Sequence, residues 1–407
     1  MILSLLTLSL FFIIWIFVFF FYKEQKKIYG INALLIIIIF IGPAVYYFLG
    51  GTSYRIFSDD ALIKYHYLSS TIFFINTLFL IVKNKIKISS ITKFLDQKAF
   101  SQFTILTKIY FVLMFLFCLT YIILFFNKFP LIVFLKESII IDRPDGTGTI
   151  PHFYTMSTIM MMVFPSVFFI LHDAIKNNKF FKFIMFLIII LFMTIAGHKG
   201  LVVFFFIFYW FYILNRKINL KFISLFIISI IIYAIAKGRI NFSEHNLTYL
   251  MNSSFVRMFV TQGAGLIARI HLISTNYNFV EWIPIKNQVC SLVYHVKINT
   301  CSMPTYFIGD IIVNYGYFIA LLLYIVLGIP LLYILKIADN FYSKSVFIKW
   351  NIFILFFLFS MAEISIYSLL RLTAMILNVL IVYYLSRTHI VKTENAYKIK
   401  FIKNKFN

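Results

Sequence analysis

Eleven stretches of apolar residues run through the chain, and charged residues separate each stretch from the next. Most of them approach the length of about 20 residues that a helix needs to cross the hydrocarbon core of a bilayer. Hydrophobic residues make up 62% of the chain, whereas soluble domains average about 45–50%. The sequence therefore predicts an all-α, polytopic integral membrane protein of about 11 transmembrane helices, with residues 1–407 in a single transmembrane domain. The stretches cover residues 2–22, 31–50, 65–82, 106–127, 152–171, 181–197, 200–214, 220–236, 306–335, 350–369 and 372–386.

Lysine and arginine are unevenly distributed between the two sets of loops that connect these stretches. One set, which includes the C-terminal tail, carries 24 of the 37 cations and five of the 14 acids, a net charge of +19. The opposite set carries 13 cations and nine acids, a net charge of +4. Because cytoplasmic loops are enriched in Lys and Arg, we expect a cytoplasmic C-terminus and an outward N-terminus. The overall charge of +23 thus reflects membrane topology and not nucleic-acid binding.

Residues 237–304 form the only long segment that is not itself membrane-like, and we expect them to form one large outward loop. The loop contains six cations, including Arg239, Arg257 and Arg269. Residues 252–274 read as a helix or a helix pair, with a break at residues 263–265. Two interpretations remain open for its arginines: contact with lipid headgroups from an interfacial helix, or bidentate binding of a diphosphate substrate.

Two further charged residues lie where the apolar stretches meet the outer side. Lys199 lies in the turn Gly197-His198-Lys199-Gly200, where it either extends to the interface or binds phosphate at the mouth of a cavity. Asp310 lies in the outer half of the stretch that follows the long loop, and ionisable groups at such depths are functional candidates. No motif with metal-ligand spacing is present, and we expect no metal and no cofactor.

Cys290 and Cys301 both lie in the long loop, on the oxidising side of the membrane if the topology is correct. The ten residues between them, SLVYHVKINT, alternate as in a β-strand. We therefore predict a disulfide between Cys290 and Cys301, worth about 3 kcal/mol at most.

The chain resembles the O-antigen polymerases (Wzy family, oligosaccharide repeat-unit polymerases) of Gram-negative inner membranes. Three features carry the resemblance: the large outer loop between the eighth and ninth spans, the sequence Ala196-Gly197-His198-Lys199-Gly200, and Gly309-Asp310…Asn314-Tyr315-Gly316. Many members have Ser-Arg-Gly in place of residues 198–200. The paired Arg-x10-Gly loops of some members are absent, since Ala268 and Leu250 occupy the glycine positions after Arg257 and Arg239.

The resemblance implies polymerisation of undecaprenyl-diphosphate-linked repeat units at the periplasmic face, without a metal or a nucleotide sugar. The N-terminus would be periplasmic, and a chain-length regulator and other O-antigen assembly proteins are the expected partners. Cations would stabilise the departing diphosphate, and a carboxylate or histidine would deprotonate the acceptor hydroxyl. The candidate cations are Lys199, Arg239, Arg257 and Arg269, and the candidate bases are Asp310, Glu244 and His271, in that order.

Two other functions stay open at this point. A lipid-linked oligosaccharide flippase would distribute polar residues through its spans and lack the long loop. An O-antigen ligase would carry a His-Asn pair where this chain has Thr305-Tyr306. Because the loop faces water, we also expect Arg257 and Arg269 to be essential for activity and to contribute little to folding.

Overall fold

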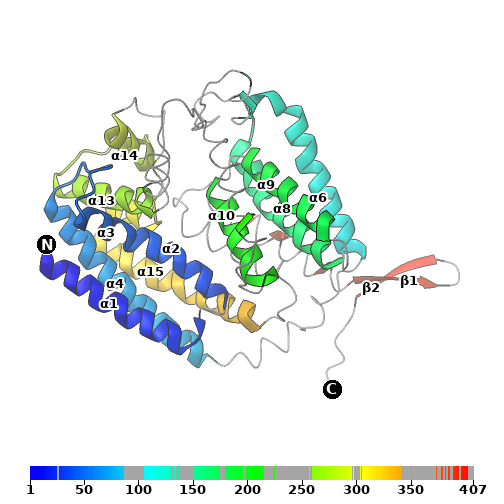
Figure 1. Cartoon of the computed structure of the whole chain (residues 1–407), viewed down its shortest axis with the longest axis horizontal. Helices are drawn as coiled ribbons and strands as arrows, with labels where there is room; N and C mark the ends of the chain where they lie inside the picture. Colours follow the sequence, from blue (N-terminus) through cyan, green and yellow to red (C-terminus); the bar gives the residue numbers. More distant parts are fainter. Residues whose placement is uncertain are drawn as a thin grey trace. The chain divides into compact units, whose positions relative to one another are not determined.

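The computed structural model is predominantly helical and divides into two compact units, each of which is considered by itself (Figure 1). Unit 1 comprises Met1–Ser89, Asn246–Asn340 and Leu355–Leu372, and unit 2 comprises Ser90–His245, Phe341–Ile354 and Thr373–Asn407. The structure describes residues 1–24, 27–86, 105–129, 132–133, 136, 150–174, 179–195, 199–214, 223–224, 256, 259–295, 297, 303, 305–340, 350, 373, 377–378, 381, 384–385, 388–393 and 396–401.

Within these residues, four helices are long and apolar enough to cross a membrane. They are α1 (Ile2–Phe21), α4 (Asp59–Lys85), α6 (Ile105–Leu124) and the segment Ile308–Pro330 of α15 (Ile308–Asn340). Shorter apolar helices accompany them, among them α2 (Ile28–Phe40), α3 (Gly42–Phe48), α8 (Phe153–Ala174) and α9 (Lys179–Ile195). These helices are consistent with the predicted transmembrane protein, whereas the number of 11 spans, the periplasmic loop and the single domain stay predictions.

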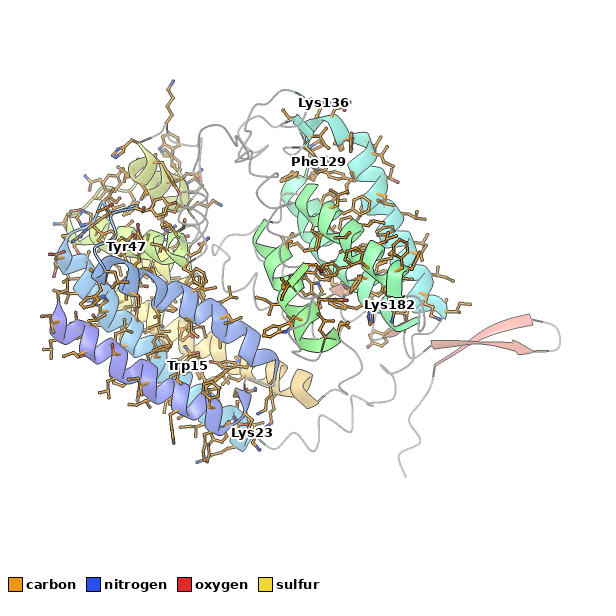
Figure 2. All side chains as sticks on the ribbon, viewed as in Figure 1. Trp15, Lys23, Tyr47, Phe129, Lys136 and Lys182 are labelled. Atoms are coloured by element: carbon orange, nitrogen blue, oxygen red, sulfur yellow. The ribbon has the colours of Figure 1, made fainter. Side chains whose placement is uncertain are left out.

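Unit 1 is built around α4, which packs lengthwise against α1 (Figure 1). Trp15 of α1 (Figure 2) is 1% exposed. Its ring centroid lies 5.3 Å from that of Phe73 on α4, with the two rings tilted by 57°. The outer face of α1 remains apolar and exposed, as Leu3, Leu6 and Phe17 show. An exposed apolar face of this kind is what a membrane helix presents to lipid.

Helix α13 (Thr261–Ser274) comes from the predicted outer loop but packs against α2, α3, α4 and α15. Two glycines allow the close approach. A Cβ on Gly263 would lie 2.3 Å from the carbonyl oxygen of Ile39, and a Cβ on Gly42 would lie 2.0 Å from that of Phe259. Small residues bring helix backbones together in this way in membrane proteins. The helix runs without interruption through residues 263–265, so the predicted break there is wrong.

Helix α14 (Ile285–Tyr294) includes residues 291–294, the first four of the ten for which the alternating pattern predicted a β-strand, so the prediction is wrong for these four. Its buried residues Val289, Cys290 and Val293 follow helical spacing. The buried amide of Gln288 fixes the preceding turn: its Oε1 accepts from the Val280 N–H at 2.9 Å, and its Nε2 donates to the carbonyls of Val280 and Ile283. These hydrogen bonds hold the turn of residues 280–283 against the first turn of α14.

Helix α15 contains one break, at Gly316, whose φ of +83° and ψ of 173° lie outside the helical region. Glycine adopts such angles without the steric penalty that a Cβ would bring. The break separates a short first segment, which carries Asp310, from the long apolar remainder.

Unit 2 contains α6, α8, α9, the 3-10 turn η2 (Phe126–Lys128), α10 (Lys199–Phe208) and the π-helical segment η4 (Tyr209–Ile213). Aromatic rings fill its interior: Phe186 stacks on Phe205 at 5.2 Å, and both lie near Tyr209 or Trp350. The indole of Trp350 donates to the carbonyl of Met161 at 3.1 Å. The unit also includes an antiparallel hairpin of β1 (Thr388–Thr393) and β2 (Ala396–Phe401), which amends the all-α prediction.

Candidate functional site

Arg269 on α13 and Asp310 on α15 form an ion pair across 41 positions of sequence. The Arg269 Nε donates to Asp310 Oδ1 at 2.7 Å. The remaining guanidinium nitrogens also have partners, since Nη1 donates to the carbonyl of Gly265 at 2.9 Å and Nη2 to that of Met303 at 3.2 Å. The Arg269 side chain is fully buried, whereas that of Asp310 is 14% exposed. A buried guanidinium is tolerated here because its hydrogen bonds and its charge are both satisfied.

The backbone around this pair is shaped to admit the arginine. A Cβ on Gly309 would lie 3.0 Å from Arg269 Cδ and 2.6 Å from Thr305 Cγ2, so the side chain passes directly over this glycine. Thr305 in turn donates its hydroxyl to the carbonyl of Gln262 at 2.6 Å. The residues that lead into α15 are thus bound to α13 by two hydrogen bonds: Arg269 donates to the Met303 carbonyl, and Thr305 donates to the Gln262 carbonyl.

This geometry corrects the expectation for Arg269. The sequence predicted a wet, outward cation that contributes little to folding, and the interfacial alternative placed it against lipid headgroups. The guanidinium is instead enclosed between two helices and shielded from solvent. Arg269 therefore has a structural role in unit 1, and its side chain does not reach the surface.

Asp310 is the partner that stays accessible. It lies in the first turn of α15, where the helix dipole favours a negative charge. Its Oδ1 is held by Arg269, and among the described residues its Oδ2 has no donor. The arrangement leaves a carboxylate with a fixed orientation and one oxygen available to a hydroxyl or another donor.

His271 lies two residues after Arg269 and contacts the start of α4. The backbone N–H of Ser58 donates to His271 Nδ1 at 3.3 Å. In the neutral ring, this hydrogen bond assigns the proton to Nε2, which then faces outward from Ser58 as a donor. One turn farther, Lys64 on α4 donates to Ser274 at 3.1 Å. Residues 51–64 connect the second and third apolar stretches, so with an outward N-terminus they are also on the predicted outer side. Through these contacts they meet part of the predicted outer loop 237–304 at one end of unit 1.

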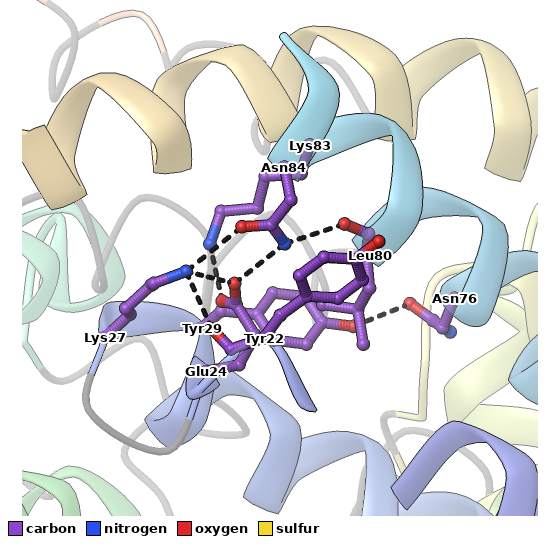
Figure 3. Close-up of polar contacts among 8 residues, drawn as sticks. All are labelled: Tyr22, Glu24, Lys27, Tyr29, Asn76, Leu80, Lys83 and Asn84. Carbon is purple, nitrogen blue, oxygen red and sulfur yellow. Dashed lines mark hydrogen bonds and ion pairs between the residues drawn. The ribbon is translucent and has the colours of Figure 1, made fainter. Parts of the chain in front are cut away.

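At the other end of α4, Glu24 lies at the centre of a second buried ionic cluster (Figure 3). Its Oε2 accepts from Lys83 and its Oε1 from Lys27, both at 2.6 Å, and Asn84 donates to Oε1 at 3.1 Å. Glu24 and Lys83 are both fully buried. Burial raises the pKa of Glu24, but the charge of Lys83 and these hydrogen bonds outweigh it, so the pKa lies below its ordinary value.

Sequence reasoning treated these residues only as loop charges and missed the cluster. The available signal was that Glu24 is the single acid in a loop otherwise rich in lysine. A neighbouring chain of hydrogen bonds extends into the helices. Tyr29 donates to Asn76 Oδ1 at 3.2 Å (Figure 3), and Asn76 donates to the Tyr324 hydroxyl at 2.8 Å. It joins α2, α4 and α15.

The other predicted site residues are not brought together by the described geometry. Lys199 is the first residue of α10 in unit 2. Arg239, Glu244 and Arg257 lie outside the described residues. Cys290 is buried and disulfide-bonded, but Cys301 also lies outside them, so the Cys290–Cys301 pairing stays a prediction.

In the part of the chain that the structure describes, no group of three or more His, Cys, Asp or Glu side chains is placed to hold a metal ion. Asp59 and Asp60 start α4 and form exposed ion pairs with Arg55 and Lys64. No family model, no curated protein and no solved structure matches the chain.

Proposed function

We propose that the protein is a membrane glycosyltransferase that polymerises undecaprenyl-diphosphate-linked O-antigen repeat units at the periplasmic face of a bacterial inner membrane. The observation that supports this function best is the placement of α13. This helix comes from the long cationic loop, is buried among apolar helices, and fixes the carboxylate of Asp310 through Arg269. A catalytic base held by a rigid partner is what such a transfer needs.

In the proposed reaction, Asp310 Oδ2 accepts the proton of the acceptor hydroxyl as the hydroxyl oxygen bonds to the anomeric carbon of the growing glycan. The bond from that carbon to the diphosphate oxygen breaks, and undecaprenyl diphosphate leaves. Lys199, Arg239 and Arg257 are the proposed cations for the diphosphate charge. Arg269 is a positioning residue, because its buried guanidinium does not reach a lipid-linked substrate.

His271 takes a different part from the one first expected. Because its Nδ1 accepts from Ser58, the ring offers Nε2–H as a hydrogen-bond donor to a sugar oxygen. Glu244 remains a second proposed base in the same loop.

The decisive experiment is deletion of the gene in a strain that makes O-antigen, followed by gel analysis of its lipopolysaccharide. Loss of a polymerase leaves core with one repeat unit. Loss of a ligase leaves bare core, and loss of a flippase leaves bare core with repeat units trapped on the cytoplasmic side. Either of the last two patterns would replace the proposal with the corresponding alternative.

A reconstituted system separates chemistry from transport. Purified protein in liposomes should convert lipid-linked repeat units into a ladder and release undecaprenyl diphosphate, without a nucleotide sugar or metal. The proposed orientation is checked separately: alkaline phosphatase fused near residue 275 should be active, and fused near residue 345 inactive. The reverse pattern would contradict a periplasmic site.

A further inference from the structure

The hairpin at the end of unit 2 has a defined register. Strand β1 (Thr388–Thr393) pairs antiparallel with β2 (Ala396–Phe401), and only residues 394 and 395 separate the two strands. Ile390 is opposite Ile399, and Val391 is opposite Lys398. In an antiparallel pair, directly opposed residues share a face, and successive residues alternate between faces.

This register sorts the hairpin into two unlike faces. One face combines the pairs Thr388–Phe401, Ile390–Ile399 and Lys392–Tyr397, so that it is mainly apolar and aromatic. The other face combines His389–Lys400, Val391–Lys398 and Thr393–Ala396, so that its charged residues are all basic.

A two-stranded hairpin is at best marginally stable in water, and its apolar face needs a covering surface. The hairpin follows the last apolar stretch, residues 372–386, after a single intervening residue, Arg387. It lies at the end of unit 2 where Lys182 of α9 is found. There β1 contacts α6, and the rest of the hairpin extends beyond the helices (Figures 1 and 2). That end belongs to the lysine-rich side of the predicted topology.

We propose that the hairpin Thr388–Phe401 lies on the membrane surface, with the Ile390, Ile399 and Phe401 face in the interfacial region, and that anionic phospholipids strengthen this contact. The apolar face supplies the insertion, and aromatic residues such as Tyr397 and Phe401 suit the headgroup boundary. The cations on the opposite face lie one sheet thickness above it. The cations therefore remain within one Debye length, about 8 Å, of the charged membrane surface.

Charge favours lipid over a protein as the covering surface. Residues 387–405 contain six Lys or Arg and a single acid, Glu394, and the cytoplasmic leaflet is the negatively charged surface closest to the end of a span. This inference does not depend on the proposed enzymatic activity.

The test uses the full-length protein in nanodiscs, with spin labels at single introduced cysteines. Labels at Ile399→Cys and Phe401→Cys should collide more with oxygen, and those at Lys398→Cys and Lys400→Cys more with a water-soluble nickel complex. Adding phosphatidylglycerol to a phosphatidylcholine bilayer should shift the first pair deeper. Equal collision with the nickel complex at all four sites would overturn the proposal. If the label at Ile399→Cys is shielded from both reagents, protein and not lipid covers this face, and the proposal is overturned as well.

Two variants separate the contributions without unfolding the helices. Ile390→Ser with Ile399→Ser should abolish the alternation at Phe401→Cys while the helical circular dichroism is unchanged. Lys398→Gln with Lys400→Gln should keep the alternation in phosphatidylcholine and lose the shift caused by phosphatidylglycerol. A shift that persists in the lysine variant would contradict the electrostatic part of the proposal.

Discussion

The two ionic clusters of unit 1 lie at opposite ends of α4 and differ in what they leave open. At one end, Glu24 and Lys83 are both fully buried, and Glu24 accepts three hydrogen bonds. At the other end, Arg269 is fully buried while Asp310 keeps 14% of its side chain exposed. The Glu24–Lys83 pair is enclosed on both sides, whereas the Arg269–Asp310 pair encloses the cation and leaves the carboxylate accessible.

The difference separates a structural role from a chemical one. A closed pair has no access to a substrate, so it serves only to join the turn after α1 to the end of α4. A pair with one accessible oxygen can orient that oxygen for proton transfer. The predictions below test this division in order of decreasing effect.

Removing Glu24 should have the largest effect on folding. Glu24→Ala removes the buried carboxylate that pairs with the fully buried Lys83, and breaking a buried pair by removing one partner costs about 3–5 kcal/mol. We expect a strong loss of thermal stability in detergent and of abundance in the membrane. Asp59→Ala is the matched control, because its ion pair with Arg55 is exposed and should change stability by less than about 1 kcal/mol. Equal stability of the two variants would show that the Glu24 cluster is not structural.

Arg269→Ala should rank second, at about 3 kcal/mol, because Asp310 and two carbonyls lose their donors. Arg269→Lys keeps the charge but not the three directed hydrogen bonds, so we expect an intermediate loss. Chemical unfolding of the purified variants measures both. Wild-type stability in Arg269→Ala would restore the earlier expectation of a free, outward cation.

The wrong expectation of an outward Arg269 shows which features could not be predicted from the sequence. Hydropathy located α1, α6 and the start of α15 to within three residues, and the start of α4 to within six, because spanning length is a property of a single segment. The burial of Arg269 depends instead on Asp310, 41 residues away, and on glycines that let α13 approach α2 and α3. No local pattern encodes such a contact.

The same limit applies to two local assignments. Alternation predicted a strand over residues 291–300, but residues 291–294 belong to α14, where Val289 and Val293 are buried at helical spacing. The β-hairpin after residue 387 was read only as a basic tail, since its two faces become visible only once the register is known. Of the candidate site, Asp310 and Arg269 were both predicted, and their pairing was not.

Asp310→Asn should separate activity from folding. The amide keeps a hydrogen-bond acceptor for Arg269 Nε but loses the basic oxygen, so we expect polymerisation to fall by about 100-fold or more. The loss of stability should be smaller than for Arg269→Ala. The rate of ladder formation in liposomes, measured beside thermal unfolding, checks both expectations. Full activity in Asp310→Asn would remove Asp310 as the base and leave Glu244 as the remaining carboxylate to test.

Gly309→Ala tests how closely the arginine passes the entry to α15. Its Cβ would lie 2.6 Å from Thr305 Cγ2 and 3.0 Å from Arg269 Cδ, so we expect a loss of about 1–3 kcal/mol from overpacking. Gly265→Ala is the matched control on α13, because its nearest contacts are 3.3 Å and 3.4 Å. Thermal unfolding should therefore rank Gly309→Ala well below Gly265→Ala in stability. The opposite ranking would mean that Arg269 does not lie over Gly309.

The smallest predicted effect is a pH dependence of stability that arises from Glu24. Because the folded pKa of Glu24 lies below its ordinary value of 4.5, the cluster stabilises the folded state above about pH 4.5 and loses this contribution as the pH falls through the folded pKa. One group changes stability by at most about 1.4 kcal/mol per pH unit. The contribution of Glu24 to the unfolding free energy of the wild type should therefore be constant from pH 7 to pH 5. It should decrease as the pH is lowered further. In Glu24→Gln this part of the fall should disappear, and an identical acid-side slope in both proteins would show that the ionised form of Glu24 does not stabilise the fold.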